Sequence, residues 1–131
     1  MARLFTLDEA ETLLPALLPL VDRLRDSKSK HDQLQEAAGT LGQRSQTNGH
    51  AITDDLQRAE RELALSTQAM NDLIEEISAF GCEVKDLNLG LLDFRSMLDG
   101  NEVYLCWKAG ESKIEWWHEL NRGFSARKPL P

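Results

Sequence analysis

The stretch LLDFRSMLDGNEVYLCW, residues 91–107, decides the fold. Asp99-Gly100 is a strong two-residue signal for a β-hairpin turn, and apolar residues alternate with polar ones on both sides of it. The sequence therefore predicts an antiparallel hairpin whose strands cover residues 91–95 and 102–107.

The position of this turn also fixes the register of the hairpin. Counting outward from the turn pairs Phe94 with Leu105 on one face, and it places Asp93 directly opposite Cys106 on the other face. A one-residue slip would mix apolar and charged side chains on both faces, which a half-buried sheet does not tolerate. The face that we expect to be buried carries Leu92, Phe94, Leu105 and Trp107.

Two further segments extend this hairpin into a small antiparallel meander, with strands expected at residues 82–87 and 113–118. The second segment has alternatives. As a strand, it can present His118 on either face, depending on the loop at Ala109-Gly110. As a helix, Glu115 and His118 would form the Glu-x-x-His pair of di-iron carboxylate bundles, where the pair occurs twice.

The N-terminal part reads as two long helices. Thr6 and Glu9 have the spacing of a capping box, and Pro15 and Pro19 predict a break between helices at about 7–14 and 15–38. The glycine-containing segment 39–53 is expected to be a loop, after which Thr53 caps the second helix. The inward stripe of the first helix is expected to contain Leu17, Leu20, Val21, Leu24, His31 and Leu34.

The second helix carries a coiled-coil-like seam and is expected to end at Gly81. Two long helices joined by a loop pack antiparallel. We therefore predict an α+β protein, a single domain over residues 1–131, in which 1–80 form a helical hairpin and 81–131 form the β-rich module. The seam consists of Leu56, Leu63, Met70 and Ile77, with Ala59, Ser66, Leu73 and Phe80 in the companion row.

The net charge and the apolar runs of the chain disfavour some classes of binding partner. The chain has 131 residues and a net charge of −7, with no basic cluster. Binding along a phosphate backbone depends on Lys and Arg, so nucleic acid and anionic membrane surfaces are disfavoured. Leu13 to Val21, the most apolar run, is too short to cross a bilayer. With Cys82 and Cys106 as the two cysteines and no signal peptide expected, a cytoplasmic location is predicted.

The chain resembles the bacterial family called domain of unknown function 2203. The resemblance rests on residues 81–87, 90–94, 103–107, 110–111 and 117–120, with further similarity at 5–7 and 14–15. No activity is assigned to that family, so the resemblance supports the domain boundaries and implies no reaction. The chain departs from the family pattern at two positions: Arg95 replaces a frequent proline, and Ala126 replaces a frequent glycine before Arg127.

The side chains that could bind a metal or a small ligand are concentrated in the β-rich module, near the three tryptophans. Asp93, Cys106 and His118 are candidate ligands for a divalent metal such as zinc. A structural explanation is also open, with Cys106 buried as a small hydrophobe and Asp93 bonded to a turn. The full set of candidate ligand-binding residues is Asp86, Asp93, Cys106, Glu111, His118 and Glu119.

Two functional hypotheses follow from these patterns. The first is an interaction or scaffold protein that forms a homodimer through its helical hairpin, because the seam offers an apolar edge to a second copy. The second is a metal- or small-ligand-binding domain, which includes an enzyme in which His118 serves as a general base. The sequence favours the first hypothesis slightly, since it needs only the helical patterns.

Overall fold

The computed structural model describes residues 3–48 and 50–131, with side chains described for 3–43 and 54–131. It contains two long helices, α1 (Leu7–Asn48) and α2 (His50–Ser78), followed by a five-stranded antiparallel sheet. The predicted α+β class, with a helical hairpin and a β-meander, is confirmed. The strands are β1 (Glu83–Asp86), β2 (Leu91–Leu98), β3 (Asn101–Lys108), β4 (Trp116–Glu119) and β5 (Lys128–Pro129), paired in that order.

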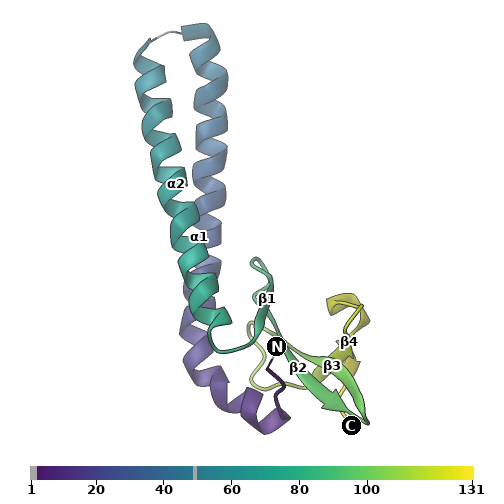
Figure 1. Ribbon diagram of the computed structural model, residues 1–131. Coiled ribbons are helices and arrows are strands. Elements are labelled where there is room, and N and C mark those ends of the chain that lie inside the picture. The colour runs from purple at the N-terminus through teal and green to yellow at the C-terminus, as the bar shows by residue number, and fades with distance from the viewer. Residues whose placement is uncertain (1–2, 49) are drawn as a thin grey trace. The chain divides into compact units, whose positions relative to one another are not determined.

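Contacts divide the chain into two compact units. The sheet unit consists of Met1–Arg25 and Leu73–Pro131, and the hairpin unit consists of Asp26–Asp72. Each long helix therefore contributes residues to both units. The candidate functional residues all lie in the sheet unit, where Figure 1 shows the green strands β1 to β3 beside the purple N-terminal turns of α1.

The β2–β3 hairpin has the predicted register. Asp99 and Gly100 have φ angles of 51° and 82°, as a type I′ turn requires at both central positions. Phe94 pairs with Leu105, and the four residues predicted for the core face, Leu92, Phe94, Leu105 and Trp107, are all buried. Phe5 packs edge-on against Phe94, with ring centroids 5.3 Å apart, and closes this core from the N-terminal segment.

The start of α1 is also as predicted, whereas the break at the prolines is wrong. Thr6 and Glu9 make both hydrogen bonds of the capping box, but α1 continues through Pro15 and Pro19. Both prolines are exposed, so the carbonyl groups that lose their partners face water. Each proline disfavours the helix by about 3 kcal/mol. Burial of nearby apolar side chains such as Leu17 stabilises the helix by about 1.5–3 kcal/mol per side chain and so offsets this cost.

The predicted loop at 39–53 is wrong as well. The helix α1 extends through Gly39 and Gly42 to Asn48, and α2 already begins at His50, so Thr53 lies inside α2. Gly49 lies outside the described residues. A glycine costs a helix only about 1 kcal/mol relative to alanine, and a helix of 42 residues tolerates two of them.

Gly90, at the start of the β2–β3 hairpin, gives a stability prediction. Its φ is +68°, and an added Cβ would lie 2.8 Å from the Cβ of Ala109 and 3.0 Å from Val21. We expect Gly90→Ala to lower the free energy of unfolding by about 3 kcal/mol, through backbone strain and overpacking. Gly100→Ala is the matched control, because φ is +82° but the Cβ meets nothing within 4 Å. That control should lose only about 1 kcal/mol in urea denaturation, and equal losses would contradict the packing argument.

Candidate functional site

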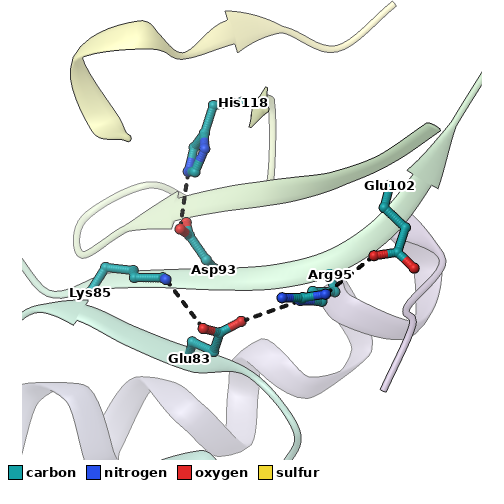
Figure 2. A network of polar contacts seen from close by, with 6 residues as sticks. All are labelled: Glu83, Lys85, Asp93, Arg95, Glu102 and His118. Atoms are coloured by element: carbon teal, nitrogen blue, oxygen red, sulfur yellow. Dashed lines mark hydrogen bonds and ion pairs between the residues drawn. The ribbon is translucent and has the colours of Figure 1, made fainter. Parts of the chain in front are cut away.

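Three strands bring Asp93, Cys106 and His118 together on the face of the sheet opposite the apolar core. Asp93 of β2 pairs with Cys106 of β3, and β4 places His118 beside Tyr104 of β3. The potential ligand atoms of the three residues lie within 4.8 Å of one another. Their exposed fractions are 3%, 1% and 1%, so the cluster is withdrawn from bulk water. Figure 2 shows His118 pointing toward Asp93.

The strand β4 settles the alternatives for residues 113–120. Residues 116–119 are a strand and residues 113–115 are not, so the predicted strand 113–118 was placed too early. Trp116 pairs with Cys106, and His118 therefore takes the face that Cys106 occupies. The Glu-x-x-His pair would need a helix here, so the di-iron interpretation is wrong.

The hydrogen bonds of His118 define its tautomer. Nδ1 lies 2.8 Å from the carbonyl oxygen of Glu119, which only accepts, so Nδ1 carries a proton and donates it. In the neutral ring Nε2 then presents a lone pair, 3.0 Å from Oδ2 of Asp93. A lone pair facing a carboxylate oxygen is repulsive unless a cation lies between them. The contact therefore requires either a proton or a metal ion.

Asp93 is an unusual carboxylate because it is buried and incompletely bonded. Burial raises the pKa of Asp93 above its usual range, although the neighbouring His118 opposes the shift. Its second oxygen, Oδ1, has no hydrogen-bond partner among the described residues. Buried polar atoms are rarely left unpaired, so Oδ1 has the capacity to accept a hydrogen bond or to bind a cation.

Cys106 does not have the surroundings of an activated nucleophile. Burial raises the pKa of its thiol to about 12, and the charge of Asp93 adds to the shift while Arg127 opposes it. Nucleophilic cysteines need a lowered pKa, usually from an adjacent imidazole. Here both ring nitrogens of His118 are engaged by Glu119 and Asp93, so no Cys–His pair forms.

Because both thiols are buried, we expect them to react slowly with thiol reagents in the folded protein. Burial also raises the pKa of the Cys82 thiol, from 9.0 to about 11. A raised pKa means less thiolate at a given pH, about a hundredfold less at pH 8 for a shift of two units. In the presence of EDTA, both thiols should react with an aromatic disulfide reagent at least about a hundredfold more slowly than in the unfolded chain. The rate should rise only as the pH approaches 11, and a fast-reacting Cys106 at pH 8 would contradict this account.

A cavity of about 270 Å³ opens onto the cluster. Four of the six residues predicted from the sequence line it, namely Asp86, Asp93, Cys106 and His118. Asp86 also has a structural role, since its Oδ1 accepts hydrogen bonds from the backbone N–H groups of Asn88 and Leu89. The other lining residues are Lys85, Leu91, Arg122, Gly123 and Phe124.

The remaining two candidates, Glu111 and Glu119, do not line this cavity. The carboxylate of Glu111 accepts hydrogen bonds from Lys108 N–H and from Arg127, whose guanidinium stacks over Trp116. Glu119 forms an ion pair with Lys128 at 2.7 Å. Both carboxylates therefore hold the C-terminal segment against the sheet, and only the backbone carbonyl of Glu119 reaches the cluster.

A chain of ion pairs runs along the same face of the sheet (Figure 2). Glu83 lies between Lys85 and Arg95, at 3.2 Å and 3.9 Å, and Arg95 continues to Glu102 at 3.2 Å. Lys85 and Arg95 also lie over the ring of Tyr104, 4.7 Å and 5.6 Å from its centroid. These ion pairs form a partly exposed polar border beside the buried cluster, on strands β1 to β3.

Sequence reasoning missed the basic residues of the cavity. Lys85 follows Glu83 by two positions in β1, and residues two apart in a strand lie on the same face of the sheet. The face of Lys85 could therefore have been predicted from the sequence. Arg122 and Phe124 follow β4 in a segment without hydrophobic periodicity, and β5 is only two residues long. No pattern in the sequence indicated that this segment returns to the sheet.

Comparison with known proteins gives one match. A model of the family described as "Uncharacterized conserved protein (DUF2203)" matches residues 3–130. No curated protein and no solved structure matches the chain. Because the match covers nearly the whole sequence, including all three residues of the cluster, the chain belongs to this family of uncharacterized conserved proteins.

Proposed function

We propose that this protein binds a divalent metal ion, zinc by its ligand chemistry, through Asp93, Cys106 and His118. The observation that carries the proposal is the convergence of three different ligand types from three adjacent strands, all buried and with ligand atoms within 4.8 Å. Thiolate, imidazole and carboxylate are the ligands that zinc takes in proteins. Structural zinc sites have four protein ligands, whereas three leave a position open for water or another molecule.

The second contact of His118 supports this proposal. Histidines that ligate metals almost always donate their other ring N–H to a carbonyl or carboxylate, which fixes the ring and its tautomer. The Nδ1–H of His118 donates to the carbonyl of Glu119 at 2.8 Å in this way. The ring is therefore already oriented with Nε2 directed at Oδ2 of Asp93, where a cation could be bound by both atoms.

Charge balance favours a metal over a proton shared between His118 and Asp93. A shared proton would satisfy Nε2 and Oδ2, but it would leave Oδ1 of Asp93 with no partner better than the weak S–H donor of Cys106. A divalent cation displaces the proton of the Cys106 thiol, and one carboxylate and one thiolate together offset its two positive charges. A neutral buried site avoids the large cost of burying an unpaired charge.

Zinc titration with calorimetry and thermal unfolding tests the proposal. We expect one zinc ion per chain, and an increase in the free energy of unfolding of about 2.7 kcal/mol when free zinc is a hundred times its dissociation constant. EDTA should reverse the increase. Elemental analysis of protein purified without chelators shows whether a metal co-purifies with it. Absence of stoichiometric binding at micromolar zinc would overturn the proposal.

Self-association through the helical hairpin remains a second proposal. Leu65 of α2 is 72% exposed and offers an apolar contact to a second copy. The coiled-coil-like seam supports the idea less, because Met70 and Ile77 are buried within the single chain. Sedimentation equilibrium should give a dimer that Leu65→Lys weakens, and a monomer at high concentration would overturn this proposal.

A cytoplasmic location is also part of the proposal. Cys82 and Cys106 are both free thiols, and a thiol that serves as a zinc ligand must stay reduced. Among the described residues, no helix is long and apolar enough to cross a membrane. Fractionation of cells that produce the protein would test the location, and recovery from an oxidising compartment would contradict it.

A further inference from the structure

We propose that the open position of the metal site takes a small oxyanion, a carboxylate or phosphate group, that enters through the cavity over the cluster. This inference rests on the proposed metal site and names the ligand class of that site. Its first support is the shape of the site. Three protein ligands lie at the floor of a cavity of about 270 Å³, so a fourth ligand has room beside them.

The charges around the cavity favour an anion. Lys85 and Arg122 line it, together with Asp86 as the only acidic residue outside the cluster in that lining. A divalent ion neutralises Asp93 and the Cys106 thiolate, which leaves two positive charges and one negative charge at the border. One oxygen of Asp86 is already taken by two backbone N–H groups, so it competes weakly for the two cations.

The two cations are available to a ligand. Within the part of the chain that the structure describes, Arg122 makes no close ion pair and its side chain is exposed. The pKa of Glu119 is lowered first by its hydrogen bond with Lys128 and only to a smaller extent by the charge of Arg122, so the guanidinium keeps its donors for a ligand. Lys85 pairs with Glu83 at 3.2 Å, but both side chains are partly exposed and an ammonium group has three donors. An Arg–Lys combination around a metal is well suited to the oxygens of a carboxylate or phosphate.

The size of the cavity limits the ligand. A water molecule occupies about 30 Å³, so the space corresponds to about nine waters, and it lies just below the range usual for drug-sized ligands. Leu91 and Phe124 supply apolar walls next to the polar floor. The cavity thus fits a small oxyanion with a short apolar part.

Cobalt-loaded protein tests this inference with direct optical readout. Tetrahedral Co²⁺ with a thiolate ligand gives visible d–d bands and a charge-transfer band, and the d–d bands shift when the open position changes its ligand. We expect saturable shifts on titration with inorganic phosphate or acetate, and the two arms show which oxyanion binds more tightly. Arg122→Gln and Lys85→Gln should each weaken the tighter anion about tenfold. Co²⁺ affinity should be unchanged in Arg122→Gln and should not fall in Lys85→Gln, because Lys85 is a positive charge near Asp93.

Lys113→Gln is the matched control, since Lys113 is exposed and does not line the cavity. It should bind the anion as the unsubstituted protein does. If Co²⁺ binds with its thiolate band but neither anion shifts the d–d bands, the oxyanion inference is overturned while the metal site stands. Equal weakening by Lys113→Gln would also overturn it. If no thiolate band forms, the metal site itself fails.

Discussion

Replacing Cys106 by alanine is expected to weaken zinc binding by at least about a hundredfold. Loss of a residue that merely hydrogen-bonds a metal ligand costs a site about 10- to 100-fold in affinity, and Cys106 is the proposed thiolate ligand itself. Alanine differs from cysteine by one sulfur atom, so the sheet should keep its structure. Competition with a zinc-binding dye would measure the two dissociation constants.

Cys82→Ala is the matched control for this substitution. Cys82 is also a free, buried cysteine, but its thiol contacts the carbonyl of Ile77 and it does not belong to the cluster. It should therefore change zinc affinity by less than about twofold. If the two alanine variants bound zinc equally well, Cys106 would not be a ligand and the proposed site would be wrong.

The largest loss of stability is expected for Trp107→Ala, at about 3–5 kcal/mol in the free energy of unfolding. Trp107 is completely buried on the core face of β3, and its indole N–H donates to the carbonyl of Glu111 at 2.9 Å. Alanine would leave a cavity and an unpaired carbonyl. Urea denaturation in the presence of EDTA measures the loss without any contribution from metal binding.

Trp117 provides the comparison within the same sheet. It is only half-buried, and Lys128 lies 5.0 Å above its ring. Trp117→Ala should lower the free energy of unfolding clearly less than Trp107→Ala, because Trp117 buries less apolar surface on folding. Trp117 pairs with Leu105 and lies on the same face as Trp107, so equal losses, with an unchanged dependence on urea concentration, would contradict the difference in burial between the two indoles.

The β-hairpin could be predicted in detail because two independent signals agree there. Asp99-Gly100 fixes the turn, and strict alternation fixes which face is buried, so the opposition of Asp93 and Cys106 followed from counting. The position of His118 could not be derived in the same way. The loop after Gly110 decides its face, and a one-residue difference in loop length reverses the outcome.

The helices show the opposite case. Pro15, Pro19, Gly39 and Gly42 are local signals against a helix, yet α1 passes through all four positions. At Gly39 and Gly42 the local cost is only about 1 kcal/mol each, which a long helix tolerates. At the prolines, a local cost of about 3 kcal/mol each is outweighed by buried neighbours such as Leu14 and Leu17, and burial depends on contacts that are distant in the sequence. The position of Arg122 could not be predicted for the same reason, because it depends on the path of the chain after β4.

Zinc-edge X-ray absorption of the loaded protein tests directly whether Asp93, Cys106 and His118 bind zinc. We expect one sulfur neighbour at about 2.3 Å and nitrogen or oxygen neighbours at about 2.0–2.2 Å, with the sulfur lost in Cys106→Ala. A coordination shell without sulfur, or one whose sulfur persists in that variant, would contradict the proposed site.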